Sequence, residues 1–276
     1  MDTRPVGVFD SGFGGLTLLD ECISQLPNEQ FVYFGDTLRV PYGTKAPDEV
    51  MDYSLETLRW FEKRDVKTIV IGCNTTSSIA LPLLNTMTEI PVFGMIDAGV
   101  STVMTWLELT GIEINRLGII GTKNTITSRI HENRLRTEGF LGEIYPTTCS
   151  LFSMLFIEGI MDKSIWLATI NYYLSNMRDV GVDGLLLGAT SYPLASEYLQ
   201  EYFGGGVQIF DPNFMMAKQL KEYLDLNDLS NPRENTNKAD LFVTGSLDAF
   251  VNYYKRFFQF DYEKLESVVL SDLAIQ

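Results

Sequence analysis

The strand-like run at residues 68–76, Thr-Ile-Val-Ile-Gly-Cys-Asn-Thr-Thr, has an echo at residues 184–193, Gly-Leu-Leu-Leu-Gly-Ala-Thr-Ser-Tyr-Pro. Each is an apolar run that ends in glycine, followed by one small residue and then by side chains with hydroxyl or amide groups. The small residue is Cys73 in the first run and Ala189 in the second. One copy therefore carries a thiol where the other carries a methyl group, and this difference limits the reactions that the protein can catalyse.

A second pair of segments repeats at nearly the same spacing. Residues 7–12 read Gly-Val-Phe-Asp-Ser-Gly, and residues 118–122 read Gly-Ile-Ile-Gly-Thr. In both halves such runs alternate with stretches of helical spacing, a pattern typical of βαβ units and a mostly parallel sheet. We therefore predict an α/β fold with two pseudo-symmetric parallel-sheet domains. The carboxyl ends of their strands would face one shared cleft, where open parallel sheets bind ligands.

The predicted elements divide the chain into two domains. The first takes residues 1–97 plus roughly 208–276, and the second takes residues 98–207. We expect strands at residues 6–9, 31–34, 68–71, 92–96, 117–120, 185–187, 207–210 and 241–244. We expect helices at residues 16–26, 46–64, 77–87, 126–139, 166–180, 214–226 and 248–258. Residues 227–240 are rich in Asn, Pro and charge and are predicted to form a surface loop.

The composition is that of an acidic globular protein. Of 276 residues, 45% are hydrophobic and 21% are charged, and the formal net charge is −15. This composition excludes a disordered chain, and the length is enough to bury a substantial core. A surface this acidic repels phosphate backbones and anionic lipid, so we expect neither nucleic acid nor membrane as a partner. A small acidic ligand stays possible, because a few oriented backbone N–H groups can hold a carboxylate.

The cysteines and the N-terminus predict a cytoplasmic protein. The chain runs from its first residues straight into a strand-like segment, without the apolar stretch of a signal peptide or a run that could span a bilayer. Its three cysteines, Cys22, Cys73 and Cys149, are widely spaced, which favours free thiols in a reducing compartment. A single histidine and no Cys-x-x-Cys motif exclude the common zinc arrangements, so we expect no metal.

A glycine-rich turn at residues 11–17, Ser-Gly-Phe-Gly-Gly-Leu-Thr, follows the first strand and opens a helix. It could hold an anion on its backbone N–H groups, or it could be only a tight turn between strand and helix. A dinucleotide fingerprint would need glycine at position 17, where Thr17 stands. Asp36 does end the next strand, as a ribose-binding acid would, so the nucleotide interpretation is weak rather than absent.

Cys73 and Asp10 are the candidate reactive residues. Cys73 follows an apolar strand and precedes a helix, whose N-terminal backbone dipoles would lower the pKa of a thiol. The alternative is a buried small hydrophobe, which is the commoner role for a lone cysteine. Asp10 ends the first strand and could be no more than a helix cap. It becomes a catalytic candidate if a reacting group lies opposite.

Other residues of note are assigned structural roles. Cys22 and Cys149 lack a polar neighbourhood and are expected to be structural. His131 lies in a polar helical stretch, residues 128–134, and is expected to be solvent-exposed. The Phe- and Met-rich run at residues 151–157 is expected to belong to the core.

Together these segments resemble the cofactor-independent aspartate/glutamate racemase superfamily, most closely the glutamate racemases. The resemblance covers nearly the whole chain and rests on residues 7–17, 33–37, 41–43, 72–75, 118–122 and 187–194. It implies a reaction in which two cysteines flank the α-carbon of an amino acid. A thiolate removes the α-proton from one face and a thiol returns a proton on the other. Neither a metal nor pyridoxal phosphate takes part, so the resemblance implies no cofactor.

The resemblance also assigns roles to residues of this chain. It makes Asp10 and Cys73 the acid and the cysteine of the first half, the cysteine being the one that acts on the D-enantiomer. Glu158 would match an acid that lies behind the residues in contact with the substrate. The expected ligand is a small amino acid or dicarboxylic acid, and the residues expected to grip it are Ser11, Pro41, Tyr42, Gly43, Asn74, Thr75, Thr190 and Ser191. It further suggests a homodimer and a link to peptidoglycan precursors.

Two positions depart from the family pattern, both in the second half. The second cysteine is replaced by Ala189, and the histidine two residues later is replaced by Ser191. The methyl group of Ala189 has no exchangeable proton, and the hydroxyls of Thr190 and Ser191 are poor acids without an adjacent base. Loss of a matched acid or base costs ~10²–10⁴-fold in rate. We therefore predict that two-base racemisation is lost or severely impaired.

Three functions stay open at this point, and the sequence does not decide whether the protein is still an enzyme. The first is a glutamate racemase homologue of the isomerase class that binds a glutamate- or aspartate-like acid and turns it over poorly or not at all. The second is a single-cysteine enzyme that uses Cys73 on one face, as a decarboxylase or an isomerase of a small dicarboxylic acid. The third is a non-catalytic regulatory protein on the same scaffold. Proton exchange without inversion would separate the first two from the third.

Overall fold

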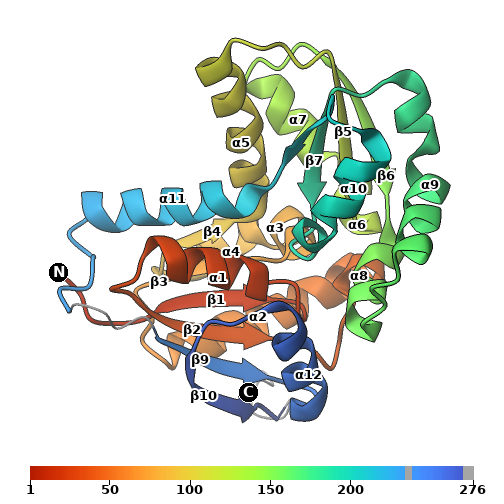
Figure 1. Ribbon diagram of the computed structural model, residues 1–276. Helices are drawn as coiled ribbons and strands as arrows, with labels where there is room; N and C mark the ends of the chain where they lie inside the picture. The colour runs from red at the N-terminus through yellow and green to blue at the C-terminus, as the bar shows by residue number, and fades with distance from the viewer. Residues whose placement is uncertain (234–237, 270–276) are drawn as a thin grey trace.

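The fold is built on two parallel β-sheets that lie in two halves of the molecule (Figure 1). The computed structural model describes residues 1–233 and 238–269. The six-stranded sheet has the order β10-β9-β2-β1-β3-β4, and the four-stranded sheet has the order β6-β5-β7-β8. The first contains β1 (Val6–Asp10), β2 (Gln30–Gly35), β3 (Thr68–Ile71), β4 (Val92–Gly94), β9 (Lys238–Val243) and β10 (Tyr262–Ser267). The second contains β5 (Arg116–Gly121), β6 (Glu143–Thr148), β7 (Gly184–Gly188) and β8 (Gln208–Phe210).

The two sheets repeat one topology. The order β2-β1-β3-β4 in the first sheet corresponds to β6-β5-β7-β8 in the second, and every pairing is parallel. This arrangement confirms the predicted α/β fold with two related parallel sheets. The strands β9 and β10 extend only the first sheet, beyond β2. Because β8 pairs with β7, the chain leaves the second sheet after Phe210 rather than at residue 208. The division into two domains stays a prediction.

Helices cover both faces of the sheets (Figure 1), which explains why the central strands are buried along their whole length. All five residues of β1 and of β7 are buried, as expected for parallel strands with helices on either side. In the first half and at its junction with the second lie α1 (Leu16–Gln25), α2 (Pro47–Glu62), α3 (Asn74–Ile79), α4 (Leu81–Met87), α11 (Pro212–Leu226) and α12 (Leu247–Phe257). The second half has α5 (Met95–Thr110), α6 (Lys123–Thr127), α7 (Ile130–Thr137), α8 (Ser150–Glu158), α9 (Lys163–Val180) and α10 (Ser196–Phe203).

Local sequence explains where the longer helices begin and end. Helix α2 begins with proline at its first position and two acidic residues in its first turn, and has Arg59 in its last turn, all of which suit the helix dipole. Helix α5 ends at Gly111, whose positive φ permits the left-handed cap. Helix α11 packs against both α1 and α5, and so joins the two halves (Figure 1).

Several sequence expectations were wrong in detail. The strand expected at residues 92–96 ends at Gly94, because Met95 already opens α5. The loop expected at residues 227–240 is shorter, since β9 begins at Lys238, and residues 234–237 lie outside the described part. The sequence analysis did not predict β6, β10, α5, α8 or α10.

His131 is buried, not solvent-exposed as expected. It is 2% exposed and, together with Leu135 one turn later, forms the inward face of α7. Neither ring nitrogen has a hydrogen-bond partner in the structure, and burial lowers the pKa of the ring to about 4. Cys22 and Cys149 are buried free thiols, in keeping with a structural role. No helix within the described residues is long and apolar enough to cross a membrane.

Candidate active site

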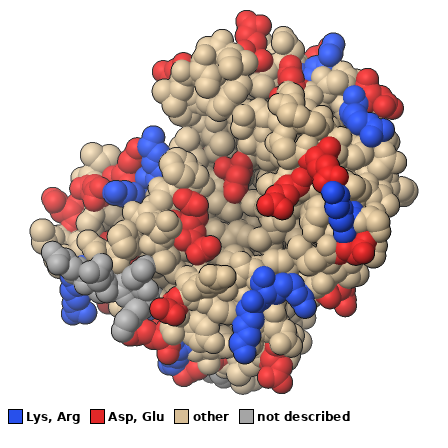
Figure 2. Space-filling view, in the orientation of Figure 1, with Lys and Arg blue, Asp and Glu red and all other residues tan. Residues whose placement is uncertain are grey.

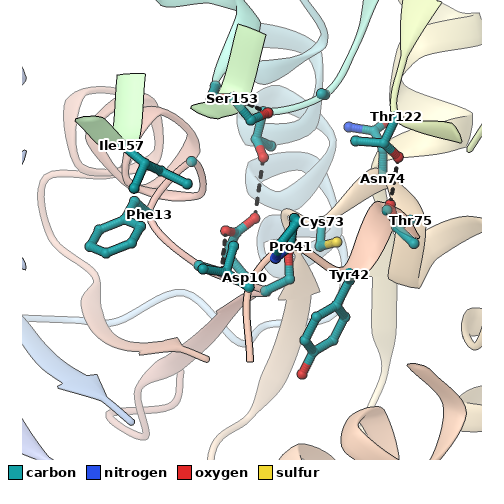
Figure 3. Close-up of a pocket in the computed structure, with 18 of the residues that line it drawn as sticks. Asp10, Phe13, Pro41, Tyr42, Cys73, Asn74, Thr75, Thr122, Ser153 and Ile157 are labelled. Carbon is teal, nitrogen blue, oxygen red and sulfur yellow. Dashed lines mark hydrogen bonds between the residues drawn. The ribbon is translucent and has the colours of Figure 1, made fainter. Parts of the chain in front are cut away.

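A small pocket lies where the carboxyl ends of the central strands of both sheets meet (Figure 3). Asp10 ends β1 and Cys73 follows β3, while Thr122 follows β5 and Ala189 follows β7. In the space-filling view, the molecule is hollowed between its two halves (Figure 2). The pocket volume is about 60 Å³. That volume holds about four to six waters, which suits a small acid and is too small for a dinucleotide.

The structure brings together the residues that the sequence predicted for catalysis and ligand contact. The predicted residues that line the pocket are Asp10, Ser11, Pro41, Tyr42, Gly43, Cys73, Asn74, Thr75, Ala189, Thr190 and Ser191. Glu158, expected behind these residues rather than among them, is exposed at the end of α8 and does not line the pocket. Its neighbour Ile157 faces the pocket instead (Figure 3). Adjacent helix positions point in different directions, and here the apolar one points inward.

Asp10 is buried and held by donors from both halves of the molecule. Its Oδ1 accepts a hydrogen bond from the backbone N–H of Gly12 at 2.8 Å, and its Oδ2 accepts one from the hydroxyl of Thr190 at 3.2 Å. Burial raises the pKa of Asp10 to about 6, although these hydrogen bonds oppose the shift. Asp10 is therefore a carboxylate at neutral pH that takes up a proton under mildly acidic conditions.

Cys73 caps the N-terminus of α3, as expected, but its pKa moves in the opposite direction from the prediction. The backbone N–H of Thr76 donates to its Sγ at 3.4 Å. Burial, and after it the nearby charge of Asp10, raise the pKa of the Cys73 thiol. Hydrogen bonds from Ser11 and Thr76 lower it by less. The positive potential at the N-terminus of this six-residue helix is too weak to offset the rise in the Cys73 pKa that burial causes. Cys73 therefore rests as a thiol at neutral pH.

The glycine-rich turn serves close packing rather than nucleotide binding. A Cβ atom on Gly15 would lie 2.4 Å from the Cβ of Asp10, and one on Gly14 would lie 3.0 Å from the backbone nitrogen of Ser191. Glycine thus lets the first half approach the second. Asp36, the candidate ribose ligand, is fully buried and does not line the pocket. It accepts hydrogen bonds from Arg39, Tyr42 and Thr244, so the nucleotide interpretation is wrong.

Residues 41–43 form a wall that reaches across to the second half. A Cβ atom on Gly43 would lie 2.4 Å from the Cβ of Thr122, so only glycine allows this approach. The side-chain amide of Asn124 donates to the carbonyl of Tyr42 at 3.2 Å. The Tyr42 hydroxyl points away from the pocket and donates to Asp36 (Figure 3). Tyr42 therefore lines the pocket without offering its hydroxyl to a ligand.

Hydroxyl and amide groups at the far end of the pocket link the halves. The hydroxyls of Thr75 and Thr122 are 2.8 Å apart (Figure 3). The hydroxyl of Thr125 lies 3.1 Å from that of Thr122 and extends this hydrogen-bonded group. The amide nitrogen and oxygen of Asn74 are buried without a partner in the described structure. Asn74 can therefore donate to, and accept from, a bound molecule.

The second half of the pocket carries no group suited to proton transfer. Its described lining residues are Thr122, Ser153, Ile157, Ala189, Thr190 and Ser191. Alkyl groups and hydroxyls do not titrate near neutral pH. The hydroxyls of Ser153 and Ser191 lie 3.1 Å apart and bond to each other. The position opposite Cys73 thus offers weak hydrogen-bond donors and no acid.

Sequence reasoning missed four lining residues of consequence, namely Thr122, Ser153, Ile157 and Tyr253. Thr122 could have been found, because it is the counterpart of Ser11 in the repeat. Ser153 and Ile157 lie in the run assigned to the core, and Tyr253 comes from the last helix, far away in the sequence. Among the described residues that line the pocket there is no Lys, Arg or His, and no cluster of metal-binding side chains exists in the described part of the chain.

Comparisons with known proteins point to one family. The sequence profile of the Asp/Glu/hydantoin racemases matches residues 14–220. A glutamate racemase of Thermoanaerobacter pseudethanolicus is 34% identical over 99% of both chains, and one of Geobacter metallireducens is 38% identical over 93% of both.

Solved structures agree with the sequence relatives. The glutamate racemase of Francisella tularensis, solved in complex with D-glutamate, has a TM-score of 0.89 and 34% identity, covering 98% of this chain and 99% of its own. That of Thermus thermophilus, in complex with β-chloro-D-alanine, has a TM-score of 0.85 and 32% identity, covering 99% of this chain and 100% of its own.

Proposed function

The chain belongs to the Asp/Glu/hydantoin racemase family, and from this premise we propose that its pocket binds a glutamate-like amino acid whose α-proton Cys73 exchanges on one face only. The observation that carries the proposal is the asymmetry of the pocket, with Cys73 on one side and Ala189 on the other. Inversion needs a proton donor on each face of the α-carbon. Here the second face meets a methyl group and hydroxyls, so racemisation is lost or severely impaired.

The first half contains what a one-face exchange requires. The Cys73 thiolate takes the α-proton, and the negative charge that forms on the ligand is stabilised by hydrogen bonds from Asn74 and Thr75. The proton then returns from the same Cys73 thiol, so the configuration is kept. Because Asp10 raises the pKa of Cys73, a ligand ammonium group beside Asp10 would favour the thiolate. Proton removal is thereby tied to ligand binding.

A second candidate reaction is favoured by the protonation state of Cys73. A raised pKa keeps Cys73 as a thiol, which is the form that donates a proton. Decarboxylation of a small malonate-type acid needs only such a proton donor. Carbon dioxide leaves, and the remaining carbanion takes the proton of the Cys73 thiol. Methylmalonate in D₂O tests this reaction, with deuterated propionate as the expected product. Absence of propionate after long incubation would remove this candidate and leave the exchange proposal intact.

Chiral chromatography tests the loss of inversion. We expect D-glutamate incubated with the protein to stay D-glutamate, since Ala189 supplies no proton. The variant Ala189→Cys/Ser191→His restores both missing groups and should produce L-glutamate at a rate at least about tenfold above that of the unmodified protein. The matched control Ser153→Ala alters a neighbouring hydroxyl and should produce none. Rapid racemisation by the unmodified protein would refute the proposal.

Two further properties are proposed, the location of the protein and its oligomeric state. Cys22, Cys73 and Cys149 are all free thiols, which supports a location in the reducing cytoplasm. Homodimer formation stays a prediction from the family resemblance, and analytical ultracentrifugation would test it.

A further inference from the structure

We propose that the phenol hydroxyl of Tyr253, on the C-terminal helix α12, accepts a hydrogen bond from the amino group of the ligand beside Asp10. This inference rests on the proposed function, in which the pocket binds an amino acid. It assigns a ligand contact to a helix that lies beyond residues 14–220, the part of the chain that the family profile matches.

Tyr253 carries a buried hydroxyl that has no partner. The residue lines the pocket, is 3% exposed, and its hydroxyl makes no hydrogen bond in the described structure. The other buried tyrosines of the described chain differ. Tyr33 donates to the carbonyl of Gly12, Tyr42 donates to Asp36, and Tyr192 donates to the carbonyl of Cys149. Since buried polar groups are normally satisfied, the exception marks a place where a bound molecule completes the bonding.

The ring of Tyr253 is held firmly, so the hydroxyl keeps its position. Its centroid lies 5.0 Å from that of Phe13 and 4.9 Å from that of Phe257. Phe13 also lines the pocket and lies with Ile157 on the side away from Thr75 and Thr122 (Figure 3). Tyr253 therefore belongs to the Phe13 end of the pocket. A hydroxyl fixed in advance on a packed ring binds a ligand with little loss of side-chain entropy.

The charge at this end selects an amino group over a carboxylate. Asp10 is the only charged side chain among the described residues that line the pocket. Tyr253 and Asp10 line the same pocket. Burial, and after it the charge of Asp10, raise the pKa of Tyr253, so the phenol stays neutral. A ligand carboxylate here would be repelled by Asp10. An ammonium group is attracted, and it can donate one hydrogen bond to the carboxylate and another to the phenol oxygen.

The substitution Tyr253→Phe removes only the hydroxyl, and calorimetric titration with D-glutamate measures the result. We expect the affinity for D-glutamate to fall about ten- to a hundredfold, as for a hydrogen bond to a charged group. The matched control is Tyr254→Phe, the same change one residue later. Tyr254 is half-buried, packs against Phe260 and Tyr262, and does not line the pocket. Its affinity should stay within about twofold of the unmodified protein.

Thermal unfolding separates a binding role from a structural one. Because the hydroxyl has no partner in the free protein, Tyr253→Phe should leave the Tm of the free protein unchanged or higher. Only the rise in Tm on adding D-glutamate should shrink. A lower Tm of the free variant, together with full retention of D-glutamate affinity, would overturn the inference.

A crystal structure of the complex with D-glutamate decides which ligand group is contacted. The expected result is an amino nitrogen about 2.7–3.2 Å from the Tyr253 hydroxyl oxygen. A hydroxyl bonded to the side-chain carboxylate would overturn the assignment. A failure of the proposed function gives a different result. If the unmodified protein binds neither D- nor L-glutamate nor aspartate, the proposed function and the Tyr253 contact are both refuted. Binding that Tyr253→Phe leaves unchanged refutes the Tyr253 contact alone.

Discussion

The two halves of the pocket share a backbone and differ in chemistry. In the first half, β1 ends in Asp10 and β3 leads to Cys73; in the second, β5 and β7 lead to Thr122 and Ala189. The strand order is the same in both. The fold depends on apolar runs and glycines that the repeat retains, whereas proton transfer depends on single atoms. A duplicated unit can therefore keep its shape and its ligand-binding groups after one copy has lost its reactive group.

The same comparison separates binding from catalysis within one site. Hydroxyl groups come from both halves, and Thr190 of the second half donates to Asp10 of the first. Among the described lining residues, groups that titrate come only from the first half, including the phenol of Tyr253 on α12. We therefore expect substitutions in the first half to affect proton transfer, and those in the second half to affect ligand binding and stability.

The largest effect is expected from Cys73→Ala. This variant removes the group that carries the proton, so the exchange of the α-proton of D-glutamate should fall by ~10²–10⁴-fold. Deuterium incorporation followed by NMR measures it. Cys22→Ala removes a buried thiol outside the pocket and should keep the exchange rate. Exchange that persists in Cys73→Ala would show that another group does the chemistry.

Acid should lower the free energy of unfolding through His131, a buried histidine of the second half that does not line the pocket. In the folded state the pKa of His131 is lowered from 6.5 to about 4, so only the unfolded chain takes up its proton in this range. His131 therefore contributes stability that is present above pH 6.5 and is lost as the pH falls toward 4. The loss at pH 4 should be about 3 kcal/mol.

Urea unfolding at several pH values measures this loss against a matched variant. In His131→Leu the contribution is absent, so the difference in free energy of unfolding between the two proteins should change by that amount between pH 7 and pH 4. A constant difference across this range would mean that the imidazole is hydrated in the folded protein.

Asp10→Asn tests the electrostatic coupling inside the first half. Because the charge of Asp10 raises the pKa of Cys73, the neutral amide should let Cys73 ionise at lower pH. The pH profile of Cys73 alkylation by iodoacetamide should then move toward acid. Asp20→Asn alters an exposed carboxylate on α1 and should leave the profile in place. A shift toward alkali in Asp10→Asn would contradict the described geometry.

The smallest effect is expected at the hydroxyl pair that joins the halves. Thr75→Val and Thr122→Val each break the 2.8 Å hydrogen bond between these residues and should each reduce the free energy of unfolding by about 1 kcal/mol. The double variant should lose less than the sum of the two, because both changes remove the same bond. Thr127→Val, on the exposed side of α6, is the matched control. Strict additivity would mean that the bond contributes nothing.

Much of the fold and the site could be read from the sequence, because both depend on local pattern. Alternating apolar and helical stretches predicted the two parallel sheets, and the repeat located Cys73, Asp10 and Ala189 at strand ends. The errors came from facts that only packing decides. Ile157 on α8, in a run assigned to the core, lines the pocket. His131 lies on the same buried face of α7 as Leu135. Burial raises the pKa of Cys73, which was expected to be lowered.

Proton transfer on one face only can be tested with D-glutamate in D₂O. NMR follows deuterium entry at the α-carbon while chiral chromatography follows the appearance of L-glutamate in the same sample. We predict that deuterium enters D-glutamate, that L-glutamate does not accumulate, and that L-glutamate supplied separately keeps its α-proton. Formation of L-glutamate at the rate of deuterium entry would contradict the account, because it would require a working proton donor beside Ala189.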